Sequence, residues 1–131
     1  MILRRITVDR YGCFGTADFE FRRGLNLICG GNETGKSLLL MALPATIVGL
    51  EHGMRLRRWG DSLSCRATLL FEGSDRAVRL TRELEDNLVR LEERGAEGQW
   101  RETFAGRVPP SGKSPEQLVY AEHLRRLFGV A

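Results

Sequence analysis

No apolar run in this chain approaches the ~20 residues that a membrane-spanning helix needs. The first residues alternate apolar and polar side chains and lack the longer apolar stretch of a secretory signal peptide. Cysteine is scarce, and the chain contains only Cys13, Cys29 and Cys65. Their number is odd, and their spacing is not that of a metal site. We therefore expect a cytoplasmic protein with reduced thiols, in which Cys29 and Cys65 pack in strands as small hydrophobic side chains.

Lysine is scarce as well, because Lys36 and Lys113 are the only lysines among 20 basic residues. The net charge of +3 is mildly basic, which permits contact with nucleic acid without requiring it. Arg55, Arg57 and Arg58 form a local cluster, either in a solvated loop or in a loop that faces phosphate or DNA. With 131 residues, of which 42% are hydrophobic, the chain is long enough for one small domain with its own core.

Both lysines stand between a glycine and a serine, but only one of them completes a phosphate-binding motif. Residues 30–37 have the sequence Gly-Gly-Asn-Glu-Thr-Gly-Lys-Ser, which is the G-x-x-x-x-G-K-S pattern of a P-loop. The glycines let successive backbone N–H groups face a phosphate, the lysine reaches the β- and γ-phosphates, and the serine hydroxyl is the expected Mg²⁺ ligand. The predicted phosphate-binding residues are Gly30, Gly31, Asn32, Glu33, Thr34, Gly35, Lys36, Ser37 and Leu38, with Ser37 also on the metal.

The second Gly-Lys-Ser, at residues 112–114, lacks the first glycine of the motif. It is better explained as the start of a helix. Ser114 has the properties of an N-cap, Pro115 of a first helical residue, and Gln117 of the reciprocal partner in a capping box. An amphipathic helix is predicted over residues 114–128, with Gly129 as its stop.

The segments on both sides of the P-loop support the motif. Residues 24–29 form a short apolar run in which Asn26 is the one polar residue, as is typical of a central strand covered on both faces. Residues 38–43 are good helix formers, and Pro44 should kink or end the helix that starts at Lys36. Strand, glycine loop and helix is the context that a P-loop requires.

Period-two alternation predicts further strands. Residues 2–9 and 16–21 favour an antiparallel pair beside the central strand. Residues 64–104 favour an antiparallel meander, with Trp100 and Phe104 on one face of its last strand. Residues 76–95 also fit a helix, and the sequence alone leaves both alternatives open. The predicted fold class is α/β, a P-loop NTPase lobe with a mixed sheet, an antiparallel meander and few helices.

These features together resemble the N-terminal lobe of the ATPase head in SMC-like proteins of the RecF, RecN, SbcC and YhaN type. The resemblance rests on a P-loop close to the first Met and on residues 8–14, which precede a Gly-Leu-Asn-x-Ile strand at residues 24–28. Residues 32–37 are close to the Asn-Glu-Ala-Gly-Lys-Ser form of YhaN-like members. Residues 58–60, Arg-Trp-Gly before a strand meander, are also similar to that group.

The resemblance implies an ABC-type head whose N-terminal lobe binds ATP and Mg²⁺. In such proteins a coiled coil separates this lobe from a C-terminal lobe that carries the Walker B acid and the signature motif. The resemblance also implies head-to-head homodimers, contact with DNA, and a role in DNA repair, recombination or chromosome maintenance, in the cytoplasm or on the nucleoid. It makes Arg10 a candidate nucleotide contact. It suggests Gln99 or Gln117 as the Q-loop glutamine, and we assign neither.

The sequence departs from the family pattern in ways that bear on activity. Gly31 stands where a proline is frequent and Leu38 where a threonine is frequent. No run of four apolar residues ends in Asp-Glu, and there is no Ser-Gly-Gly signature. We therefore expect residues 1–131 to be a single lobe of a longer ATPase, inactive or nearly so by itself. His52 and His123 have no partners at ligand spacing and are expected at the surface.

Two alternative functions follow from the same residues. One is a small stand-alone P-loop kinase or phosphotransferase, in which the arginines at 55–58 would form a lid. The other is a non-catalytic nucleotide-binding module.

Overall fold

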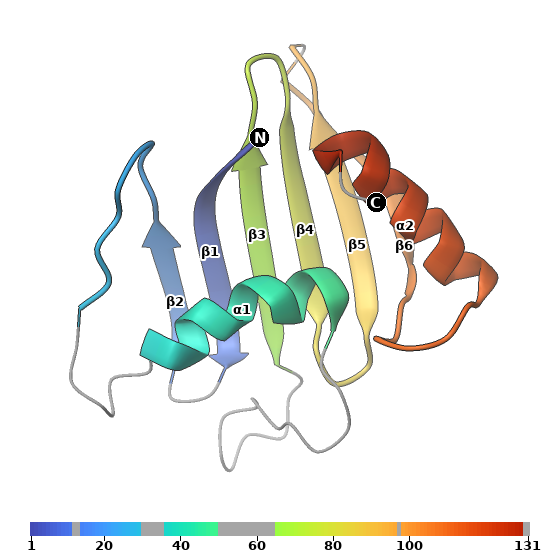
Figure 1. The fold of residues 1–131 in the computed structure, drawn as a ribbon, viewed down its shortest axis with the longest axis horizontal. Helices are drawn as coiled ribbons and strands as arrows, with labels where there is room; N and C mark the ends of the chain where they lie inside the picture. Colours follow the sequence, from blue (N-terminus) through green and yellow to red (C-terminus); the bar gives the residue numbers. More distant parts are fainter. Residues whose placement is uncertain (12–13, 30–35, 50–64, 97, 130–131) are drawn as a thin grey trace.

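The computed structural model describes residues 1–11, 14–29, 36–49, 65–96 and 98–129 (Figure 1). The described strands form a six-stranded sheet in the order β2-β1-β3-β4-β5-β6. They are β1 (Ile2–Tyr11), β2 (Phe14–Glu20), β3 (Arg66–Glu72), β4 (Ala77–Glu83), β5 (Leu88–Arg94) and β6 (Trp100–Arg107). The helices α1 (Lys36–Val48) and α2 (Pro115–Phe128) lie in front of the sheet in this view. Neither helix in the described part of the chain combines the length and apolarity needed to cross a membrane.

One face of the sheet is apolar, and both helices cover it. Alternate residues of the meander strands are buried there, namely Ala67, Leu69, Phe71, Val78, Leu80, Val89 and Leu91. The helices contribute Leu39, Ala42 and Ala45 from α1, and Tyr120 and Leu127 from α2. The predicted period-two meander is therefore confirmed, because its apolar positions form the shared core of sheet and helices.

The ambiguous segment at residues 76–95 is a β-hairpin. Strands β4 and β5 pair in antiparallel register with Leu80 opposite Leu91, and both side chains are fully buried. Asn87 in the connecting turn has a positive φ of 55°, which asparagine tolerates better than most residues. The hairpin places β5 where it also pairs with β6, so pairing on both sides decides against the helix.

The predicted central strand at residues 24–29 is not formed, and this overturns the prediction of a mixed sheet. Every pairing among the described strands is antiparallel. Leu25 is 98% exposed and Leu27 is 83% exposed. Asn26 closes a local turn instead, because its side chain accepts from Arg22 N at 2.9 Å and donates to Arg22 O at 2.7 Å. A strand needs a neighbour for its backbone groups, and the described residues place none beside this segment.

Two other side chains lie elsewhere than predicted. Cys29 is exposed because its strand is missing, whereas Cys65 is buried as expected. Trp100 and Phe104 do not share a face, because the pairing of β5 with β6 shifts register between them. Phe104 joins the core, while Trp100 stacks on Arg79 of the outer face, 4.3 Å from guanidinium carbon to ring centroid.

Helix α2 begins and ends where the sequence predicts. The Ser114 hydroxyl accepts from Gln117 N, and the Gln117 side chain accepts in return from Ser114 N at 2.7 Å. Pro115 is the first helical residue, and Gly129 closes the helix with a φ of 68°. The capping box and the glycine stop are thus confirmed.

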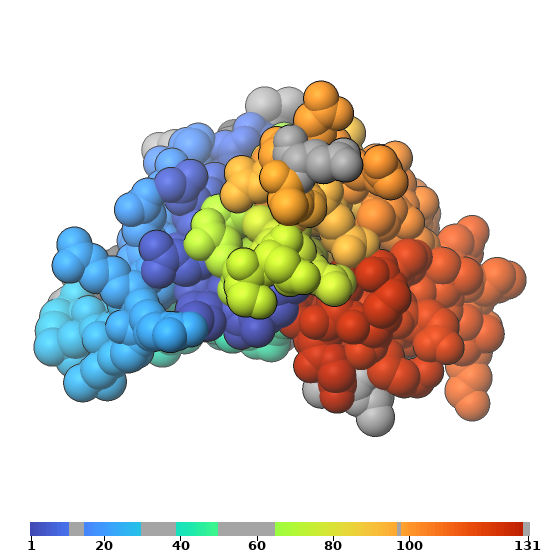
Figure 2. All heavy atoms as spheres, turned by 90° about the horizontal axis from the view of Figure 1, so that it is seen from above, coloured from blue at the N-terminus to red at the C-terminus, as the bar shows by residue number. Residues whose placement is uncertain are grey.

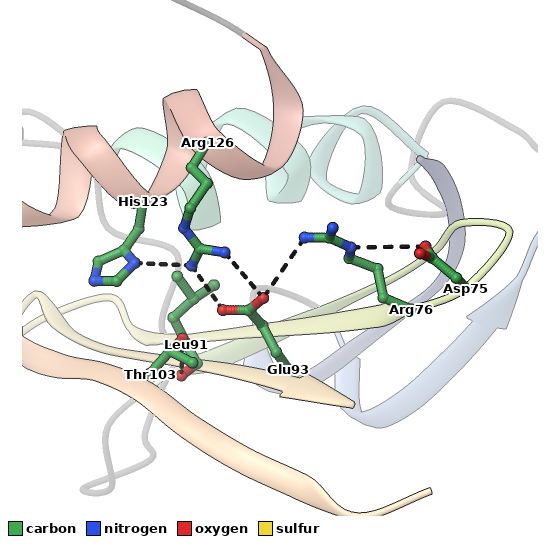
Figure 3. Close-up of polar contacts among 7 residues, drawn as sticks. All are labelled: Asp75, Arg76, Leu91, Glu93, Thr103, His123 and Arg126. Carbon is green, nitrogen blue, oxygen red and sulfur yellow. Dashed lines mark hydrogen bonds and ion pairs between the residues drawn. The ribbon is translucent and has the colours of Figure 1, made fainter. Parts of the chain in front are cut away.

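An ion pair holds the C-terminal end of α2 to β5 (Figure 3). Arg126 Nη2 lies 2.8 Å from Glu93 Oε2, and Arg76 approaches the same carboxylate at 3.9 Å. Hydrogen bonds from Arg126 lower the pKa of Glu93 from its ordinary value. Beside this pair, Phe128 packs edge-on against Phe71 with ring centroids 4.9 Å apart. Charge and apolar contacts therefore dock the same end of the helix.

Candidate nucleotide-binding site

The predicted phosphate loop leads directly into α1. Lys36, Ser37 and Leu38 are the first three residues of this helix, while residues 30–35 lie outside the described part of the chain. A helix N-terminus presents free N–H groups and the positive end of the helix dipole, which favours a bound anion. No acidic residue in the first turn competes for that position. The helix therefore starts at the residues that the motif assigns to phosphate and Mg²⁺.

The sheet side of α1 is made mostly of small side chains. Its buried residues recur at helical spacing and are Leu39, Ala42, Ala45 and Thr46. On other sides of the helix, Leu40 is 60% exposed and Val48 is 54% exposed. Because alanine and threonine are small, the helix axis can approach the sheet closely enough for side chains of the sheet to reach its backbone.

Pro44 does not end α1, which continues to Val48. Proline has no N–H, so one hydrogen bond of the helical ladder is missing at this point. The Thr46 hydroxyl donates to Ala42 O at 2.6 Å, and Gly49 N donates to Ala45 O at 2.9 Å. The last turn of the helix is held further by contacts from outside it.

Arg82 of β4 makes most of these outside contacts. Its side chain is 0% exposed, and its guanidinium donates to Thr46 O at 2.8 Å and to Ile47 O at 3.3 Å. It also donates to Val108 O at 2.6 Å and to the Asn87 side-chain oxygen at 3.1 Å. Burial lowers the pKa of Arg82, although a guanidinium stays charged throughout the range in which proteins fold. A buried cation thus lies at the negative end of the α1 dipole.

Tyr120 of α2 reaches the same place. Its hydroxyl donates to Ile47 O at 2.6 Å, so β4 and α2 both contact one carbonyl of α1. Burial raises the pKa of Tyr120. Sequence reasoning missed both residues. A signal existed for Arg82, because alternation puts it on the same face as Val78 and Leu80, where a charge must find partners. Nothing in the sequence marks Tyr120.

Arg10, the candidate nucleotide contact, is the second-last residue of β1. Its backbone has a positive φ of 54°, and its side chain lies 3.1 Å from the Asp9 carboxylate. The C-terminal end of β1 and the N-terminal end of α1 lie toward the same edge of the sheet (Figure 1). Its contact with a nucleotide stays a prediction.

The side chain of Gln117 is occupied by its role at the cap. Besides bonding with Ser114, it donates to Pro109 O at 2.9 Å and to Ser111 O at 2.8 Å. Gln99 is exposed just before β6. Both polar atoms of the Gln117 side chain are therefore engaged at the cap. In the described part of the chain, no group of three or more His, Cys, Asp and Glu side chains could hold a metal.

Of the remaining basic and histidine candidates, only His123 lies in the described part of the chain. His123 is partly exposed on α2, and its Nδ1 lies 3.1 Å from Arg126 Nη2 (Figure 3). His52 and the arginine cluster at 55–58 lie outside the described residues.

The outer face of the sheet is polar, and its charges are paired across strands. A hollow of about 530 Å³ on this face is lined in part by three ion pairs, Arg66–Glu83, Arg79–Glu92 and Arg90–Glu102. Because each arginine has a carboxylate neighbour, this hollow has no excess of positive charge. Binding of nucleic acid depends on such an excess, so this hollow does not have the character of a DNA-binding surface.

Comparison with known proteins agrees with these features. The AAA domain family matches residues 5–113. The chain belongs to this family. The matched range of this AAA domain starts within β1, contains the P-loop and the other described strands, and ends just before α2. No curated protein matches the sequence.

The fold of the AAA domain is similar to a solved structure from work on the structural biochemistry of ATP-driven dimerization and DNA-stimulated activation of SMC ATPases. The TM-score is 0.58 at 13% sequence identity, and the match covers 95% of this chain and 78% of the other. The predicted resemblance to an SMC-like ATPase head is thereby confirmed. The family match therefore identifies an AAA domain, and its fold is similar to that of an SMC ATPase.

Proposed function

We propose that this AAA domain is the ATP-binding N-terminal half of an SMC-like ATPase head that acts in DNA repair, recombination or chromosome maintenance. The observation that carries the proposal is the position of Lys36 and Ser37. Both begin a helix whose opposite end is anchored in the core by a buried arginine. A phosphate-binding loop requires such a fixed helix start, because its lysine and backbone N–H groups must converge on one anion.

The residues present suit ATP with Mg²⁺. Lys36 would contact the β- and γ-phosphates, Ser37 would hold the metal, and the backbone of residues 30–35 would surround the phosphates. The chemistry supplied by Mg²⁺, when bound, would be positive charge that neutralises the phosphate oxygens. We expect little turnover from these residues alone, because the sequence has no apolar run ending in Asp-Glu to supply a water-polarising acid.

The test compares the two Gly-Lys-Ser sites of the same chain. Mg²⁺-ATP at about 100 times its Kd should stabilise the protein by about 2.7 kcal/mol, which raises the Tm by roughly 10 °C. Lys36→Ala should weaken binding by about 1.5–3 kcal/mol, or roughly 10- to 150-fold. Lys113→Ala is the matched control, because it removes a lysine from the same tripeptide in an exposed loop. Equal binding by both variants would refute the proposal.

The exposed segment at residues 24–29 supports a second lobe as partner. Figure 2 shows the preceding part of the chain and this segment projecting at one end of the molecule, opposite α2. Leu25 and Leu27 are almost fully exposed there, in a sequence with the composition of a buried strand. We propose that a C-terminal lobe of the same protein, joined through a coiled coil, supplies the neighbouring strand. Addition of that lobe should protect the amides of residues 24–29 from hydrogen exchange.

The dimer and the DNA partner are proposed by analogy with the similar solved structure. That structure comes from work on ATP-driven dimerization and DNA-stimulated activation of SMC ATPases. The assembled head should form a head-to-head homodimer when ATP is bound. The arginines at 55–58 are the proposed DNA contact, and the low, odd number of cysteines fits a cytoplasmic location. Replacing the three arginines with alanine should reduce the salt dependence of DNA binding.

The kinase alternative is disfavoured by the described topology. Small P-loop kinases need alternating βα units, whereas β3, β4, β5 and β6 follow one another as antiparallel neighbours. A steady-state assay with added acceptor nucleotides checks this directly, and phosphoryl transfer to any acceptor would support the alternative.

A further inference from the structure

Three elements of the fold meet at the C-terminal end of α1. Thr46 O and Ile47 O belong to its last turn, and both accept hydrogen bonds from the Arg82 guanidinium of β4. Ile47 O accepts a second hydrogen bond, of 2.6 Å, from the Tyr120 hydroxyl of α2. The sheet, α1 and α2 are therefore joined at two successive carbonyl groups.

This junction is built from complementary parts. The helix has no basic residue in its own last turn, so Arg82 supplies the positive charge that favours its C-terminal end. Gly49 follows the helix with a φ of 103°, and a Cβ at this position would lie 3.1 Å from both Arg82 Nη1 and the Asn87 oxygen. A side chain there would press on the guanidinium. The glycine therefore provides both the backbone conformation and the space that the arginine needs.

We propose that Arg82 and Tyr120 are positioning residues for the nucleotide site at the opposite end of α1. The inference rests on the proposed function. From Ile47 to Lys36 the helix is about 16 Å long, so a tilt of about 5° at the clamped end would move the first residue by about 1.4 Å. Hydrogen bonds to phosphate tolerate much less than that displacement. Holding two carbonyl groups at one end therefore controls the alignment of Lys36 and Ser37 at the other.

Tyr120 makes this control depend on α2. Helix α2 lies beyond the residues that match the AAA domain family. Even so, the Tyr120 hydroxyl of α2 donates to Ile47 O of α1. Tyr120 also packs against Phe104, with ring centroids 5.6 Å apart, so the ring is held in place by β6. A shift of α2 along the sheet would pull on α1 through this single hydrogen bond.

The experiment uses conservative variants of the whole chain. Tyr120→Phe removes one hydroxyl and keeps the ring in the core, and Arg82→Lys keeps a charge but cannot reach all four acceptors. Arg90→Gln is the control, because it breaks an exposed ion pair with Glu102 on the outer face of the sheet and touches neither α1 nor α2. For each protein, hydrogen exchange of α1 amides is measured without nucleotide, and the Kd for Mg²⁺-ATP is measured at a temperature where all variants are folded.

We expect faster exchange of the α1 amides in Tyr120→Phe and Arg82→Lys, with a Kd raised roughly 3- to 10-fold and at least 10-fold respectively. In Arg90→Gln both measurements should match the unmodified chain. Unchanged α1 exchange in the first two variants would overturn the inference, and so would faster exchange with an unchanged Kd. A chain that binds no Mg²⁺-ATP even before substitution would overturn the proposed function instead, and the positioning role would fall with it.

Discussion

Replacing Arg82 with methionine should be among the most destabilising single changes in this chain. Methionine keeps a similar apolar stem but donates no hydrogen bond. Thr46 O, Val108 O and the Asn87 side-chain oxygen would then lose this donor, whereas Ile47 O would keep Tyr120. Each buried group left without a partner costs about 1–3 kcal/mol. Partial relaxation and the lower desolvation cost of methionine offset part of the sum, so we expect a loss of about 3–5 kcal/mol.

That loss is large for a domain of this size, whose free energy of unfolding should be about 5–15 kcal/mol. It corresponds to a fall in Tm of roughly 10–20 °C. The assay is urea unfolding followed by circular dichroism, with calorimetry as an independent check. Arg90→Met is the matched control, because it removes a guanidinium from the neighbouring strand on the outer face. There Arg90 is 60% exposed and its partner Glu102 is 48% exposed.

The control variant should lose less than about 1 kcal/mol, since exposed ion pairs contribute little. If the two arginine variants unfold at the same urea concentration, the argument that buried carbonyl groups depend on Arg82 is wrong. A large loss confined to Arg82→Met would instead establish that the C-terminal end of α1 is held mainly from the sheet.

Three further predictions concern other parts of the fold. Gly49→Ala should cost more than about 1 kcal/mol, because its φ of 103° and the 3.1 Å approach of the buried guanidinium both oppose a side chain; thermal unfolding measures this. The pKa of Glu93 is lower in the folded protein than its unfolded pKa of 4.5, so its stabilising contribution is present above pH 4.5 and is lost as the pH falls through the folded-state pKa. Glu93→Gln should therefore flatten the acid limb of a curve of unfolding free energy against pH. Burial raises the pKa of Cys65 to about 12, so in a chain with Cys13 replaced by serine, a thiol reagent at pH 8 should label Cys29 rapidly and Cys65 only on unfolding.

Local signals predicted much of the fold. The alternation along β3 and β4 was sufficient because one face of each strand is buried and the other is solvated. The start of α2 was predictable because Ser114 and Gln117 satisfy each other within one helical turn. Such features depend on residues that are neighbours in the chain, and tertiary contacts did not reverse them.

The failures all involve partners distant in sequence. The apolar run at residues 24–29 has the composition of a strand, but composition does not supply a neighbouring strand. The prediction that Trp100 shares a face of the sheet with Phe104 was wrong, because a register shift between β5 and β6 changes the alternation of side chains. No residue pattern in this sequence indicates that bulge.

The sequence by itself determined the P-loop pattern and the point where its helix begins, because the whole pattern lies in eight contiguous residues. Only the tertiary structure decided what holds that helix in place. Arg82 and Tyr120 lie 35 and 73 residues from Ile47 in the chain, and they meet its carbonyl because strand pairing and core packing bring β4 and α2 together there. Hydrogen bonds between such distant residues follow from the folded geometry, which no local pattern of side chains encodes.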